Sequence, residues 1–144
     1  KHEINIDFIN KINNAIENGL NVIYCIGETL NEKENGRTYE VLEKQISEVL
    51  NNVEIKNIMI AYEPVWAIGT GKVPEADEIK ENIKFINGII MEKYEEKLDI
   101  LYGGSVNETN IGELCTIKGL NGFLVGGASL DPNKVKGMLI EMEK

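Results

Sequence analysis

The sequence predicts an α/β protein built on a parallel sheet, and three observations lead to this fold class. Short apolar stretches of strand length alternate with longer stretches whose apolar residues recur every three or four positions. The short stretches are almost continuously apolar, as in parallel sheets covered on both faces. Polar residues and glycines gather directly after each short stretch, which is the edge where such sheets bind ligands.

The first half of the chain begins with a helix that ends before a glycine stop, and its two strands are separated by a polar loop and a second amphipathic helix. The predicted elements, in order, are a helix at 4–18, a strand at 22–26, a polar loop that turns at Asn35-Gly36, a helix that ends near Leu50 and a strand at 58–62.

The second half repeats the alternation twice more. Asp131 can cap the last helix, and Pro132 suits its first turn. The predicted elements are a helix from Pro74 to about Tyr94, a strand at 99–102, a short helix that stops near Gly119, a strand at 122–125 and a final helix after Asp131.

Composition bounds the class of protein. With 144 residues, 42% of them hydrophobic, the chain can form one domain over residues 1–144, and no linker interrupts it. No membrane span or signal peptide is visible, and the net charge of −9 argues against nucleic acid and anionic membranes as partners. Cys25 and Cys115 lie too far apart to suggest a metal cluster or disulfide framework. We expect packing thiols in a reducing cytoplasm.

Four strand ends carry the candidate chemistry. Glu28, Glu63, residues 103–105 and the pair Gly126-Gly127 all follow a predicted strand. The carboxyl ends of parallel strands meet at one edge, so these residues predict one composite site.

The stretch 61–74 is the most informative part of that edge. Glu63 ends a strand, and Pro64 keeps it extended. The glycines at 69 and 71 suit a lid over a ligand. Alternation places Met59, Ala61 and Glu63 on one strand face. An apolar cover would raise the pKa of Glu63 and suit it to take a proton from carbon.

Four segments in order resemble the triosephosphate isomerase family. They read AYEPVWAIGTG at 61–71, CIGE at 25–28, YGGSV at 102–106 and GFLVGGASL at 122–130. The resemblance implies a (β/α)8 barrel, a fold that typically needs ~250 residues. Four strands correspond to a half barrel of four βα units preceded by a helix. We expect strands five to eight of the barrel, the carboxyl-terminal part of the enzyme.

The resemblance also implies roles for individual residues. Glu63 would be the base that moves a proton between two carbons of a triose phosphate. The residues that would bind the phosphate through their backbone N–H groups are Gly69, Ser105, Gly126 and Gly127. The apolar cover would be Ile68 and Leu124, and the residues that hold the lid would be Tyr62, Trp66, Glu28 and Tyr102. The family implies no cofactor or metal, a cytoplasmic homodimer, and a place in glycolysis and gluconeogenesis.

Part of the family's machinery is absent from this sequence. The family also uses a lysine and an asparagine from the first strand and a histidine from the fourth. The only histidine, His2, precedes the first helix and cannot fill that role. We expect the chain alone to be nearly inactive, because nothing would stabilise the enediolate. Open sheet edges predict that it pairs with the missing half or with another copy.

Other interpretations remain open. Glu28 and Glu63 could be the carboxylate pair of a glycosidase. The chain could also be a half barrel that binds phosphate compounds without turnover, or a purely structural fragment. A nucleotide-binding loop at Gly69-Thr70-Gly71-Lys72 is disfavoured, since Val73 stands where that motif needs serine or threonine.

Overall fold

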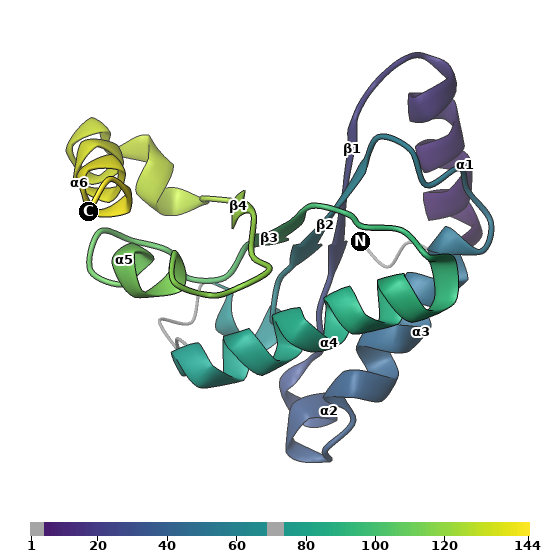
Figure 1. Ribbon diagram of the computed structural model, residues 1–144, viewed down its shortest axis with the longest axis horizontal. Helices are drawn as coiled ribbons and strands as arrows, with labels where there is room; N and C mark the ends of the chain where they lie inside the picture. Colours follow the sequence, from purple (N-terminus) through teal and green to yellow (C-terminus); the bar gives the residue numbers. More distant parts are fainter. Residues whose placement is uncertain (1–4, 69–73) are drawn as a thin grey trace.

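The computed structural model of the chain describes residues 5–68 and 74–144 (Figure 1). Helices and parallel strands alternate along it, which confirms the predicted fold class. The elements are α1 (Asn5–Glu17), β1 (Val22–Ile26), α2 (Leu30–Glu34), α3 (Thr38–Leu50), β2 (Ile58–Tyr62), η1 (Val65–Ala67), α4 (Ala76–Tyr94), β3 (Ile100–Tyr102), α5 (Ile111–Leu114), β4 (Gly122–Phe123), η2 (Gly127–Leu130) and α6 (Pro132–Met142).

The four strands form one sheet in the order β1-β2-β3-β4, and every neighbouring pair is parallel. Sequential strands are therefore spatial neighbours. The register pairs Ile26 with Tyr62, and Tyr62 with Tyr102, so these three strands end at the same level. This alignment brings the residues that follow each strand to a common edge.

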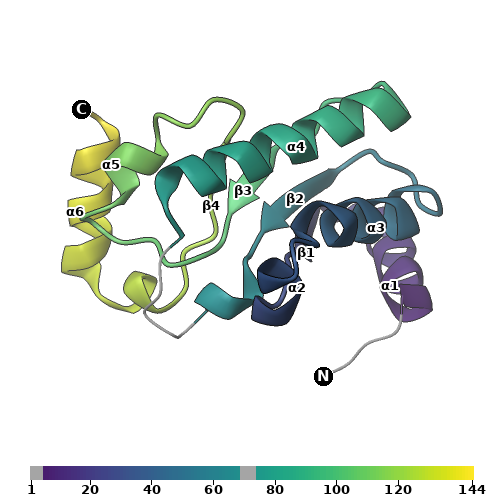
Figure 2. The same ribbon diagram turned by 90° about the horizontal axis from the view of Figure 1, so that it is seen from below.

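Helices α3 and α4 lie side by side across one face of the sheet (Figures 1 and 2). The strand residues that point toward them are buried, and alternate positions of β2 belong to the core. The core residues without measurable exposure include Leu42, Ile46, Ile60, Tyr62, Ile79, Ile83, Ile86, Ile100 and Tyr102. Burial of this face is the main stabilising contribution to the fold.

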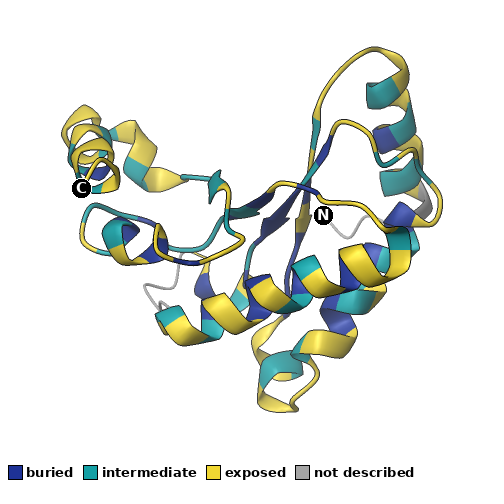
Figure 3. Ribbon diagram, viewed as in Figure 1, coloured by how far each residue is buried: buried dark blue, intermediate teal, exposed yellow. Residues whose placement is uncertain are grey.

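The opposite face of the sheet is not covered by any helix in the described part of the chain (Figure 3). Ile23 in β1 is 42% exposed, and Cys25 two residues later is also exposed. Met59 and Leu101, on neighbouring strands, are only partly buried. A parallel sheet normally has both faces covered. The structure thus presents a sheet with one complete and one open face.

Three predictions differ from the structure. The loop after β1 contains a short helix, α2, because Thr29 and Glu32 form a capping box that satisfies N–H groups at its start. The last strand extends only over Gly122–Phe123, although Leu124 still donates to the carbonyl of Tyr102. The cysteines are not packing thiols: both are exposed, and Cys25 lies on the open face.

None of the helices in residues 5–68 and 74–144 combines the length and hydropathy that a membrane span needs.

The two faces of the sheet should respond differently to truncation of isoleucine. Ile60→Ala removes a fully buried side chain and should lower the free energy of unfolding by ~2–5 kcal/mol. Ile23→Ala, on the open face, should cost less than about 1 kcal/mol. Urea denaturation of the two variants measures both values, and equal losses would contradict the assignment of faces.

Candidate active site

Glu63 is fixed by hydrogen bonds that continue the ladder beyond β2. Its backbone N–H donates to the carbonyl of Ile26 (2.7 Å), and the N–H of Gly103 donates to the carbonyl of Tyr62 (2.9 Å). Pro64 then ends the strand, and the 3₁₀ turn η1 follows. Backbone pairing from both sides therefore places the carboxylate at the sheet edge.

Two glycines allow neighbouring strands to approach Glu63 closely. A Cβ at Gly27 would lie 1.8 Å from the carbonyl oxygen of Glu63. A Cβ at Gly103 would lie 2.5 Å from its Oε1. The chain at both positions therefore needs a residue without a side chain.

Glu63 faces a cavity of about 470 Å³ at the carboxyl ends of the strands. The cavity contains eight of the residues that the sequence singled out, and they follow the strands β2, β3 and β4. Its lining is Glu63, Ile68, Gly103, Gly104, Ser105, Val106, Leu124, Val125, Gly126, Gly127 and Ala128. The predicted composite edge is thus a real concavity.

Part of the cavity lining consists of glycines and small side chains. Ser105 is held by its hydroxyl, which donates to the carbonyl of Ala67 (3.3 Å), and by Asn110, whose Nδ2 donates to the carbonyl of Ser105 (2.8 Å). Gly126 and Gly127 are exposed, with open space where a Cβ would stand. No lysine or arginine is among the described residues that line the cavity.

The environment of Glu63 suits a base. Burial raises the pKa of its carboxyl, and a hydrogen bond from the Cys25 thiol acts in the opposite direction. Partial burial, together with the charge of Glu63, raises the pKa of Cys25 to about 11. The thiol therefore stays protonated at neutral pH and can donate to the carboxylate.

Glu28 lies apart from the cavity and is fully buried. Its carboxylate accepts from Nε1 of Trp66 (2.8 Å) and from the hydroxyl of Tyr62 (3.3 Å to each oxygen). Nδ2 of Asn82 donates to the same hydroxyl (2.8 Å). The glycosidase interpretation needs two carboxylates facing one substrate, and among the described residues that line the cavity Glu63 is the only carboxylate.

Tyr102 lies beside this cluster, with its ring centroid 6.2 Å from that of Tyr62. Its buried hydroxyl has no hydrogen-bond partner within the described chain, and burial raises its pKa. Gly69 and His2 are outside the described residues.

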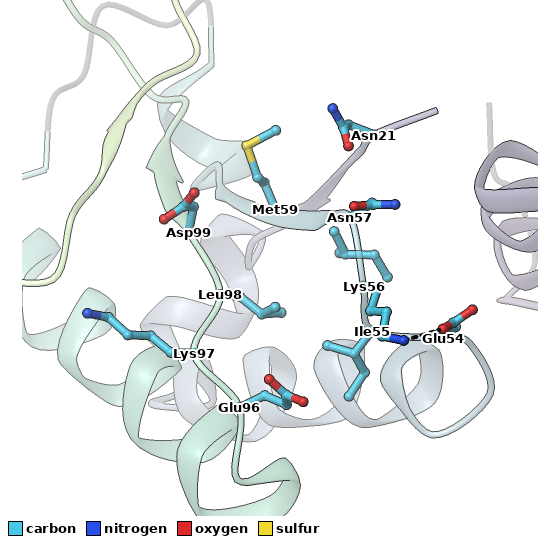
Figure 4. A pocket seen from close by; sticks show the side chains of 11 residues that line it. Asn21, Glu54, Ile55, Lys56, Asn57, Met59, Glu96, Lys97, Leu98 and Asp99 are labelled. Atoms are coloured by element: carbon cyan, nitrogen blue, oxygen red, sulfur yellow. Dashed lines mark ion pairs between the residues drawn. The ribbon is translucent and has the colours of Figure 1, made fainter. Parts of the chain in front are cut away.

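A larger cavity of about 650 Å³ lies at the amino ends of β2 and β3 (Figure 4). Its charged side chains carry both signs, and Glu54 and Lys56 pair with each other (3.3 Å). Ligands of parallel α/β proteins bind at the other end of the strands. We therefore assign the active site to the smaller cavity with Glu63.

Across residues 5–68 and 74–144, no cluster of three or more His, Cys, Asp or Glu could hold a metal ion.

Comparison with known proteins decides the family. The family model of triosephosphate isomerase matches residues 1–142. The chain belongs to the triosephosphate isomerase family. It is 48% identical to the triosephosphate isomerase of Geotalea uraniireducens over 123 residues, which are 81% of this chain and 49% of that protein. It is 47% identical to that of Thermodesulfovibrio yellowstonii over 135 residues, 90% of this chain and 55% of that protein.

A fungal relative also matches most of this chain and about half of its own length. The triosephosphate isomerase of Coprinopsis cinerea is 47% identical over 128 residues, which are 84% of this chain and 51% of that protein. The chain thus spans about half the length of the curated relatives it matches. A sheet with one open face agrees with this coverage, since four strands cannot close into an eight-stranded barrel.

Sequence reasoning missed two residues of this family member's site. Cys25 was treated as a structural thiol, but its thiol influences the pKa of the Glu63 carboxyl. Alternation along β1 places Cys25 on the same face as Ile23, which could have indicated its position. Asn110, which holds Ser105, gave no signal in its spacing.

Gly27→Ala should be strongly destabilising, because its new methyl group would overlap the backbone of Glu63. We expect the free energy of unfolding to fall by ~1–3 kcal/mol or more. The control is Gly88→Ala in α4, where a Cβ meets nothing within 4 Å. That change should stabilise the chain by ~0.5–1 kcal/mol. Chemical denaturation compares them, and a tolerated Gly27→Ala would refute the close approach.

Proposed function

We propose that this chain is the carboxyl-terminal part of a triosephosphate isomerase that interconverts dihydroxyacetone phosphate and glyceraldehyde 3-phosphate. The observation that carries the proposal is the shared cavity of Glu63, Ser105 and the Gly126-Gly127 pair. A base and an anion-binding wall that face each other are what proton transfer on a small phosphorylated substrate requires.

Glu63 acts as the base in this proposal. Its carboxylate takes a proton from the carbon beside the carbonyl, and the electron pair of the broken C–H bond forms an enediolate. The protonated carboxyl then returns the proton to the neighbouring carbon, while the hydroxyl proton passes from one oxygen of the enediolate to the other, so no external acid or cofactor is consumed. The raised pKa of Glu63 favours this exchange, because a carboxylate in a partly dry site is a stronger base than one in water.

The phosphate lies against the wall of Ser105, Gly126 and Gly127. The support is that these residues line the cavity and that no lysine or arginine does so in its described part. Backbone N–H groups can bind a dianion in a chain with net charge −9. Gly69, which the family resemblance assigns to the same phosphate, stays a prediction.

The enediolate needs a positive or hydrogen-bonding group opposite Glu63. We propose that the group comes from the other half of a barrel, which covers the open face of the sheet. An apolar groove of about 380 Å³ runs between α1 and the edge strand β1, lined in part by Phe8, Ile12 and Ile23. Another, of about 230 Å³, lies beside β4 at the other edge and includes Leu139. Free strand edges and apolar grooves are suited to further strands and helices.

The assembled enzyme is proposed to be a cytoplasmic homodimer, as the family resemblance implies. The competing proposal is a half barrel that binds phosphate compounds without turnover. The open face of the sheet supports it, and activity measurements separate the two.

The test joins the amino-terminal half of the Geotalea uraniireducens relative to this chain and measures interconversion of the two triose phosphates. We expect activity in the joined protein and almost none in the 144-residue chain alone. Glu63→Gln should lower kcat by about 10²–10⁴-fold, since the general base is lost. The matched control, Glu143→Gln at the exposed carboxyl end, should leave activity unchanged. A folded joined protein without activity would contradict the proposal.

A further inference from the structure

Trp66 is the only tryptophan of the chain. Two contacts hold its indole ring, one at the edge of the ring and one at its face. Its Nε1 donates to Glu28 (2.8 Å), and Nζ of Lys33 lies 3.7 Å from the centroid of its ring. The second contact is a cation–π interaction, which needs the ammonium directly over the ring.

Lys33 has a second partner that fixes it in this position. Its Nζ pairs with Oε1 of Glu78 at 2.6 Å, and the two side chains are only about a third exposed. Lys33 belongs to α2, Trp66 to η1 and Glu78 to the first turn of α4. One ammonium group thus joins three elements that are distant in sequence.

The turn that carries Trp66 begins only two residues after Glu63. The carbonyl of Glu28 accepts from the N–H of Val65 (3.0 Å), and the carbonyl of Pro64 accepts from the N–H of Ala67 (2.9 Å). The φ angle of Pro64, the residue between Glu63 and this turn, is fixed by its ring. With so little freedom in this short segment, a shift of Trp66 would be transmitted to the carboxylate of Glu63.

We propose that Lys33 is a positioning residue for Glu63 and acts through Trp66, an inference that rests on the proposed function. Lys33 does not line the cavity and is not a catalytic residue. A base must lie within a fraction of an ångström of its working position, so a small displacement lowers the rate of proton transfer.

A purely structural ion pair predicts a different result. Isolated surface pairs contribute little to stability, and their loss has no selective effect on catalysis. Lys44, paired with Glu48 at 3.7 Å, is a surface pair within helix α3. It therefore serves as the matched control.

The first experiment measures acrylamide quenching of Trp66 fluorescence in the 144-residue chain. Lys33→Met should raise the quenching constant about twofold, because the ammonium no longer covers the ring. Lys33→Arg keeps a cation that stacks on aromatic rings and should restore protection. Lys44→Met should match the unsubstituted chain, and equal quenching in the two Met variants would overturn the contact.

The second experiment measures kcat and KM in the joined protein, in which the amino-terminal half of the Geotalea uraniireducens relative precedes this chain. Lys33→Met should lower kcat about 3- to 10-fold and change KM less than about twofold, since proton transfer rather than binding is impaired. Lys33→Arg should retain most of kcat, and Lys44→Met all of it. An active joined protein in which Lys33→Met behaves as Lys44→Met would overturn the positioning role alone. Inactivity of the unsubstituted joined protein would instead refute the proposed function, and the positioning role with it.

Discussion

The fully buried carboxylate of Glu28 is the interaction on which the site depends. A charge without contact with water must be hydrogen-bonded, and Glu28 meets this need through Tyr62 and Trp66. Tyr62 is the last residue of β2, and Trp66 lies in the turn that follows. The buried charge therefore holds both sides of Glu63 in place. Removing Glu28 would take away the carboxylate to which Tyr62 and Trp66 both donate.

Side chains alternate along β2, so the residue that supports the site and the residue that carries the chemistry point to opposite faces of the sheet. Tyr62 points toward the helices and Glu28, whereas Glu63 points to the open face and the cavity. Burial raises the pKa of Glu63, so its ionisation opposes folding, and stability is lost as the pH rises through that pKa. Such a loss of stability on ionisation is characteristic of a functional carboxylate. The buried apolar core on the supporting side, together with the hydrogen bonds of Glu28, offsets this cost.

Much of this could be predicted from the sequence because strand positions have period two and the turn residues are distinctive. The alternation of strands and helices was predicted correctly, and Glu63, Ser105 and Gly126 line one cavity, whereas Glu28 lies apart from it. Helix α2 was missed because its capping box, Thr29 to Glu32, precedes a polar stretch without an apolar face. The influence of Cys25 on the pKa of Glu63 acts between residues far apart in the sequence, and no local pattern encodes it. The lid glycine at 69 stays a prediction.

The most direct test of the account is a carbon-13 NMR titration of the Glu63 carboxyl in the chain, assigned with Glu63→Gln. The account predicts a pKa above the ordinary glutamate value of about 4.3, because burial disfavours the charged form. Cys25→Ala should raise the pKa further, since the thiol bond that favours the carboxylate is lost. A pKa at or below that of the exposed glutamates, or a fall in Cys25→Ala, would contradict the account.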